Sequence, residues 1–181
     1  MRASFLIVGA LTLLAACSTT PENRYYTLSV EPAAISTAQS PHAGRITIAK
    51  VLLPGVIDRE QMVVVTGPQT VDIREFDRWA EPLDQFVPRT LAQDLALRVG
   101  GPTSNLPERR LFVSIDRFSV DAMGSSQLTG RWWMLEPGET AAQRRERPFV
   151  LSRPAEARDG VQVAAAMSAL LGMLADDVAR K

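Results

Sequence analysis

The chain of 181 residues has one cysteine, Cys17, so no disulfide can form within it. An apolar core must therefore stabilise the fold without a covalent cross-link. Ahead of Cys17 stand a basic start, Arg2, and an apolar run over 5–14, which is shorter than the roughly 20 residues of a membrane-spanning helix. This order predicts a secretory signal over 1–16, whose removal leaves 165 residues, a length that suits one domain.

The residues just before Cys17 favour a lipid anchor over ordinary secretion. An ordinary cut site has small residues at the first and third positions before it, but here Ala16 is small and Leu14 is large. The sequence Leu14-Ala15-Ala16-Cys17 resembles the bacterial lipobox, which implies a Cys17 carrying a thioether-linked diacylglycerol and an N-acyl chain such as palmitate. Ser18, in place of aspartate, implies sorting to the outer membrane. The alternative is a secreted protein with a chance cysteine.

Charge and composition exclude several classes of protein. The 20 basic and 20 acidic residues cancel, so we expect no nucleic-acid partner and no acidic tail. A short polar stretch over 18–24 follows the cysteine, which predicts a lipidated tether over 17–24 and a single domain over 25–181.

Hydrophobic periodicity in the first half predicts strands and then a helix. Alternating or β-branched stretches predict strands at 25–30, 45–51, 62–66 and 70–74, the last two joined as a hairpin, with a loop at 31–44. On the second of these, Lys50 interrupts the apolar face before Leu52 resumes it. A stripe at helical spacing then predicts a helix from Pro82 to Gly100-Gly101-Pro102, with Pro88 expected to kink or divide it.

The second half repeats this order. Strands are predicted at 110–121, 127–135 and 147–152, and a phase change near Asp116 predicts a bulge in the first of them. Asp159 is expected to cap a final helix with the apolar stripe Val163, Met167, Leu170, Leu171, Leu174 and Val178. Runs of strands, each followed by a helix, predict a single α+β domain: a mostly antiparallel or mixed sheet with two long helices packed on one face.

Groups that carry chemistry are scarce. A serine hydrolase would have to use the only histidine, His42, in a Pro/Gly/Ser-rich loop, and the chain lacks the ligands of a zinc site. Three carboxylates after a strand, Asp72, Glu75 and Asp77, are interpreted as a solvated loop, and Asp176-Asp177 near a helix end as exposed. We therefore expect no metal, no cofactor and no catalysis.

Two segments stand out from this pattern. The connection over 52–62 carries apolar residues around the Pro54-Gly55 turn, although it only joins two strands. The adjacent Trp132 and Trp133 must point to opposite faces of their strand, so one of them faces away from the helices. That ring either lies on charged side chains or under a loop, or it contacts another protein.

The segments together resemble the ABC-type transport auxiliary lipoprotein family, the PqiC-like group. The matching stretches are Arg24-Tyr25-Tyr26-Thr27-Leu28, Val51-Leu52-Leu53-Pro54-Gly55 with Ile57-Asp58-Arg59, Arg78-Trp79-Ala80-Glu81-Pro82-Leu83, and a C-terminal helix from Val161. The resemblance implies a periplasmic, non-catalytic domain on an outer-membrane lipid anchor. Such a domain works with an inner-membrane MCE-domain (PqiB-like) protein in lipid transport and envelope integrity, as a ring-shaped homo-oligomer.

The resemblance also suggests residues for assembly or framework. These are Asp58, Arg59 and Trp79, to which we add Trp132 and Trp133 as candidates. Simpler interpretations are an Asp–Arg pair that orients a turn and a Trp79 ring that packs the start of the helix. The alternative functions are an envelope hydrolase that uses His42 and a structural lipoprotein associated with peptidoglycan.

Overall fold

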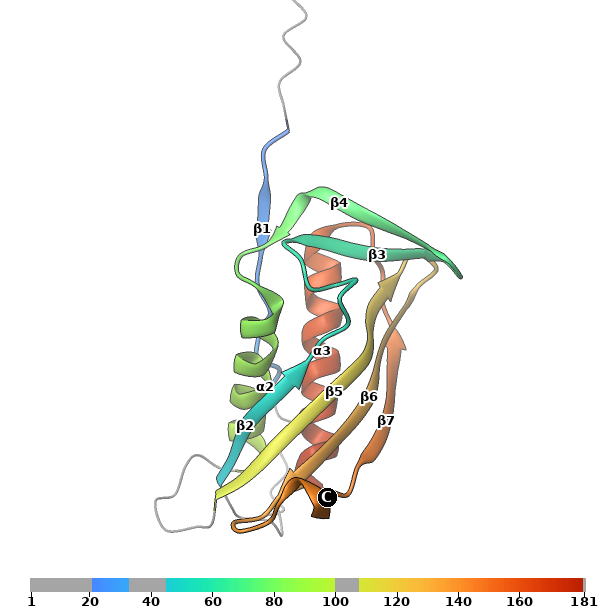
Figure 1. The fold of residues 1–181 in the computed structure, drawn as a ribbon. Coiled ribbons are helices and arrows are strands. Elements are labelled where there is room, and N and C mark those ends of the chain that lie inside the picture. Colours follow the sequence, from blue (N-terminus) through green and yellow to red (C-terminus); the bar gives the residue numbers. More distant parts are fainter. Residues whose placement is uncertain (1–20, 33–44, 100–107, 181) are drawn as a thin grey trace, which may run out of the picture.

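A computed structural model describes residues 21–32, 45–99 and 108–180, shown in Figure 1. Cys17, Ser18, His42 and the predicted helix stop at 100–102 lie outside the described residues. Within them, two long helices cover one face of a mixed sheet of seven strands. This confirms the predicted α+β domain.

The sheet has the strand order β1-β4-β3-β5-β6-β7, with β2 beside β5. The β3–β4, β5–β6 and β6–β7 pairs are antiparallel, whereas β1–β4, β2–β5 and β3–β5 are parallel. The strands are β1 (Arg24–Tyr26), β2 (Arg45–Leu52), β3 (Gln61–Gly67), β4 (Thr70–Trp79), β5 (Glu108–Asp121), β6 (Ser125–Leu135) and β7 (Arg147–Pro154). The helices are α2 (Leu83–Val99), α3 (Gly160–Ala179) and the short 3-10 helix η2 (Ala141–Gln143).

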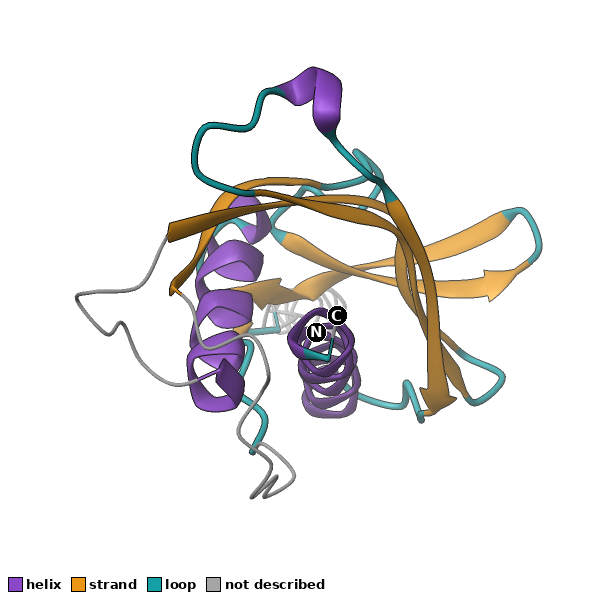
Figure 2. Cartoon of the chain, turned by 90° about the horizontal axis from the view of Figure 1, so that it is seen from below, coloured by secondary structure: helices purple, strands orange, loops and turns teal. Residues whose placement is uncertain are grey.

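Strand β5 organises the sheet because two strands share one of its edges. Its other edge pairs with β6 along most of its length. On the shared edge, β2 pairs as far as Ser114 and β3 joins only at Val120. The register shifts between Ile115 and Arg117, which confirms the predicted bulge near Asp116. The sheet curves so that α3 lies in its hollow, as Figure 2 shows from below.

A second bulge explains the interruption at Lys50. The β2–β5 register shifts between Ile48 and Lys50, so the side chains after the shift change faces. Val51, and not Leu52, therefore packs against the core. The expectation that Leu52 resumes the core face was wrong, since its side chain is 46% exposed.

Helix α2 buries the predicted stripe of Leu83, Phe86, Val87, Leu91 and Leu95. It runs undivided through Pro88, so the predicted division into two pieces was wrong. A proline inside a helix removes the donor to the carbonyl four residues earlier. Here that carbonyl belongs to Asp84, which is exposed, so water can satisfy it.

Helix α3 begins as predicted, because the Asp159 side chain accepts a hydrogen bond from the amide of Gln162 at 2.9 Å. The whole predicted apolar stripe is buried. With 20 residues and a mean hydropathy of 1.4, α3 is long and apolar enough to cross a membrane. Most of it is buried inside this domain, however, where it serves as the core helix.

The predicted ends of two strands, β1 and β4, were wrong. Strand β1 stops at Tyr26, short of the predicted end at residue 30. Strand β4 continues to Trp79, so Asp72, Glu75 and Asp77 lie in a strand and not in a loop, and Trp79 ends the strand. The cause is tertiary: β4 is held between β3 and β1, which pairs with its last three residues.

We predict that Gly130→Ala will destabilise the fold strongly. Gly130 lies in β6 opposite Ile115, and a Cβ there would come within 2.1 Å of the carbonyl oxygen of Ser114. Overpacking of this kind costs about 1–3 kcal/mol and more where backbone must move. Urea unfolding should show a lower midpoint. Gly55→Ala is the control, because a Cβ at Gly55 meets nothing within 4 Å; equal midpoints for both variants would contradict the prediction.

Candidate functional site

The structure disperses the predicted site residues over two faces of the sheet. Trp79 and Trp132 are buried in the core, and Trp133 is half-buried on the opposite face. Asp58 and Arg59 are exposed in the connection between β2 and β3. Cys17 and His42, which the anchor and hydrolase hypotheses require, lie outside the described residues.

The two adjacent tryptophans have different surroundings. Trp132 faces the helices, where its indole N–H donates to Asp177 Oδ2 at 3.0 Å. Trp133 faces away from the helices and stacks on Phe112, with ring centroids 5.3 Å apart and planes within 3°. The Arg144 guanidinium lies 5.6 Å from the Trp133 ring, which matches the expected ring beside charged side chains. Asp177 is thus half-buried and bonded, contrary to the exposure expected from sequence.

The turn that carries Asp58 and Arg59 is shaped by its backbone. The amide of Ile57 donates to the carbonyl of Pro54 at 3.1 Å, and the Ile57 side chain is buried. Neither side chain of the Asp58-Arg59 pair forms an ion pair with another described residue. The amide of Trp79 donates to the carbonyl of Glu60 at 2.7 Å, which ties this turn to the end of β4.

A groove of about 640 Å³ opens on the sheet face turned away from the helices. It lies where β2 has left β5 and β3 has not yet joined it, so no described strand pairs with that edge of β5 from Ile115 to Ser119. The 54–57 turn and the β3–β4 hairpin form its walls. Apolar side chains dominate the lining: Pro54, Val56, Val63, Val65, Val71 and Met123.

The groove is suited to binding rather than to bond chemistry. Val56, Val71 and Met123 expose 50%, 45% and 78% of their surface, and contiguous exposed apolar patches typically mark interaction sites. Its charged groups are already engaged: Asp116 pairs with Arg131 at 3.6 Å, and Asp121 accepts from the amides that follow it. Among residues 21–32, 45–99 and 108–180, no three His, Cys, Asp or Glu side chains gather as a metal site requires.

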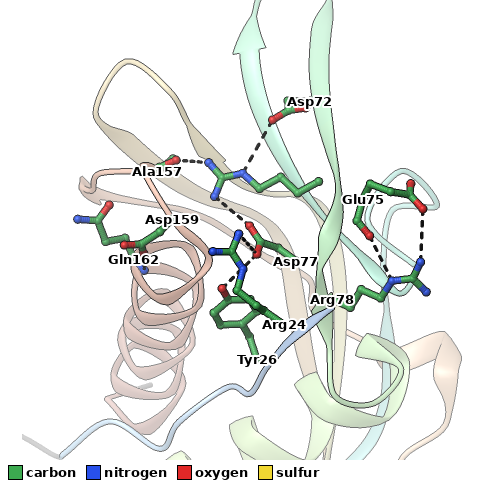
Figure 3. A network of polar contacts seen from close by, with 10 residues as sticks. Arg24, Tyr26, Asp72, Glu75, Asp77, Arg78, Ala157, Asp159 and Gln162 are labelled. Carbon is green, nitrogen blue, oxygen red and sulfur yellow. Dashed lines mark hydrogen bonds and ion pairs between the residues drawn. The ribbon is translucent and has the colours of Figure 1, made fainter. Parts of the chain in front are cut away.

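A polar cluster, which the sequence did not reveal, fastens β1 to β4 (Figure 3). The nearly buried Asp77 pairs with Arg24 at 2.8 Å, accepts the Tyr26 hydroxyl at 3.1 Å and lies 3.7 Å from Arg74. Arg74 also donates to the carbonyl of Ala157, ahead of α3. Burial and the Asp77 carboxylate raise the pKa of Tyr26. Ending the predicted strand at Arg74 hid this cluster, because Glu75 and Asp77 were interpreted as part of a solvated loop.

We predict that Asp77→Ala will lower the free energy of unfolding by about 3 kcal/mol, because it leaves a largely buried Arg74 without its partner. Urea unfolding measures the loss. The matched control is Asp72→Ala, which removes an exposed carboxylate 3.9 Å from the same arginine and should change stability by less than about 0.5 kcal/mol. If Asp72→Ala lowers the free energy of unfolding as much as Asp77→Ala does, Asp77 is not the centre of the cluster.

Solved structures resemble this chain in fold. An uncharacterised protein of known crystal structure aligns with a TM-score of 0.71 at 19% identity, covering 88% of this chain and 98% of its own. A protein from Xanthomonas campestris, assigned to a domain family of unknown function, aligns with a TM-score of 0.65 at 19% identity, covering 86% of this chain and 92% of its own. None of the curated proteins matches the chain significantly.

The model of one protein family matches residues 26–179, almost all of the part that follows the predicted tether. The family is described as the auxiliary lipoprotein component of ABC-type transport. The match begins at Tyr26, the last residue of β1, and runs through α3, so it includes the groove, the core helix and all of the polar cluster except Arg24. The chain therefore belongs to the family of ABC-type transport auxiliary lipoprotein components.

Proposed function

We propose that the protein is a non-catalytic, periplasm-facing subunit of an MCE-type intermembrane lipid transport system, anchored in the outer membrane through Cys17. In this proposal it assembles as a homo-oligomeric ring and meets an inner-membrane MCE-domain (PqiB-like) partner. The observation that carries the proposal is that the family match extends over nearly all of the described domain, whose open groove is lined mainly by apolar side chains.

The groove supports a docking role because of where its walls come from. The 52–59 connection, which carries part of the family resemblance, forms one wall through Pro54, Val56 and Ile57. The free edge of β5 forms the floor, and an unpaired strand edge can accept backbone hydrogen bonds from an extended segment. We assign to this groove an apolar segment of the MCE-domain partner.

Exposure divides the candidate assembly residues into two groups. Asp58 and Arg59 are exposed beside the groove, and Trp133 is accessible on the sheet face turned away from the helices, so these three are proposed as contacts between subunits or with the partner. Trp79 and Trp132 are buried, so we propose them as framework residues that hold the turn and α3.

The anchor and the polar cluster together hold the domain close to its membrane. Cys17 and Arg24 are 7 residues apart, so a fully extended chain spans at most about 24 Å between them. Arg24 is tied to Asp77, which transmits the position of the anchor to β4 and the groove beside it. This geometry supports a subunit that presents a fixed face to a partner reaching from the other membrane.

Photocrosslinking should identify the partner of the groove. A p-benzoyl-phenylalanine in place of Met123 is expected to capture an MCE-domain protein in cells, and Val71→Asp should reduce that capture ~10-fold by placing a charge in the apolar wall. Position 150 on β7 is the matched control, since Val150 is 79% exposed but lies outside the groove. Capture at 150 equal to that at 123, or no MCE-domain protein at either, would contradict the assignment.

The proposed anchor has its own test. The N-terminal peptide of the protein purified from membranes should begin at Cys17 and carry the mass of a diacylglycerol and an acyl chain. Cys17→Ser should lose that mass and move the protein into the soluble periplasmic fraction, because one chain holds marginally and several hold stably. An unmodified Cys17 in membrane-bound protein would refute lipidation.

A further inference from the structure

Residues 24–32, which we call the N-terminal strap, form a narrow band on the fold. In Figure 1 the strap enters beside β4 as β1 and continues down beside α2 and α3. Only Arg24–Tyr26 pair as a strand, and the rest has no regular structure. Leu28 is the one strap side chain that is fully buried among the described residues. Few apolar contacts therefore hold this segment compared with the strands and helices of the core.

The strap lies along a track of small residues on α3. Gly160, Ala164, Ser168 and Gly172 recur every four residues, so they share one face of the helix. A Cβ at Gly160 would lie 2.3 Å from the Tyr26 ring, and one at Gly172 would lie 2.7 Å from Glu31 Cβ. Between them, Ser168 Oγ accepts the amide of Ser29 at 2.9 Å and donates to the carbonyl of Ala164 at 2.8 Å. The helix surface is thus shaped to receive this segment.

A buried carboxylate holds the far end of the strap. The amide of Glu31 donates to Asp94 Oδ1 at 2.8 Å, and Asp94 is 0% exposed. Asp94 Oδ2 has no hydrogen-bond partner within the described part of the chain. The nearest cation, Arg98, lies 3.5 Å from Asp94 but is shared with Asp176, to which its Nε donates at 2.6 Å. The strap thus covers a carboxylate that is incompletely solvated in the docked state.

We infer that the N-terminal strap is a releasable segment, which detaches from β4 and α3 while strands β2 to β7 and both long helices stay folded and which is held more tightly in mildly acidic than in neutral solution. Release would lengthen the free chain. If Cys17 carries the proposed anchor, the tether then reaches at least to Pro32, 15 residues away, and can span about 50 Å instead of about 24 Å.

The direction of the pH dependence follows from Asp94. Burial is the largest cause, and it raises the pKa of Asp94 from 3.8 to about 6. The hydrogen bond from the Glu31 amide and the charge of Arg98 lower this pKa, whereas the Glu31 and Asp176 carboxylates add to the rise. A group whose pKa is higher in the docked state favours docking below its free pKa, and this contribution is lost as the pH rises through about 6. Between pH 5.0 and pH 7.5 the opening equilibrium should increase by up to about tenfold, the limit reached when release returns the pKa of Asp94 to 3.8.

Hydrogen exchange of the full chain, read by mass spectrometry at both pH values and corrected for intrinsic rates, tests this inference. We expect strap peptides to exchange faster than peptides of β5 and α3, and their protection to fall about tenfold from pH 5.0 to pH 7.5. Asp94→Asn, which keeps an acceptor oxygen but no charge, should remove that pH dependence. Equal protection of the strap and β5 at both pH values, or an unchanged pH dependence in Asp94→Asn, would overturn the inference.

A second variant tests the track directly. Gly172→Ala should displace the strap through the Cβ contact with Glu31, although alanine favours a helix more than glycine does. Strap protection at pH 5.0 should fall at least to about the wild-type value at pH 7.5, with no loss of protection in β5. The matched control, Gly55→Ala, should leave the strap unchanged. Unchanged protection in Gly172→Ala would refute docking on the track, and these measurements do not depend on whether Cys17 is lipidated.

Discussion

The burial of α3 in the hollow of the sheet is the interaction on which the rest of the structure depends. α3 contacts α2 and the strands β1, β5, β6 and β7, so it touches nearly every layer of the fold. Each fully buried Leu, Val or Met side chain contributes about 1.5–3 kcal/mol, and α3 buries several of them. With one cysteine in the chain, no disulfide supplements this core.

Hydrophobic periodicity predicted those helices and strands in which one side faces the core and the other faces solvent. The stripe of α3 and the bulge of β5 are visible in sequence because each residue's exposure follows from its own position on the helix or strand. The end of β4 is different. Asp77–Trp79, at this end, pair with β1, which lies some 50 residues earlier in the chain. Local patterns do not encode such a partner.

The candidate site was predictable in part for the same reason. Apolar residues in the 52–62 connection marked one wall of the groove, since they had no evident place in a core. The floor was hidden, because it exists only where β2 and β3 divide one edge of β5. The polar cluster around Asp77 was missed because the predicted strand ended before this residue. The strap was interpreted as a strand because apolar and polar residues alternate over Tyr25–Val30. Tertiary placement, rather than propensity, decided all three.

The contact between the strap and α3 joins segments near the two ends of the described chain. Ser29 bonds to Ser168, which is 139 residues away, so this contact closes a long loop of the chain. Strands β5, β6 and β7 can pair as they emerge, but the hollow stays open until the C-terminal helix arrives. When such a chain crosses a membrane with its N-terminus first, the N-terminal strap can therefore dock only after α3 has emerged. C-terminal truncation would expose the apolar face of the sheet.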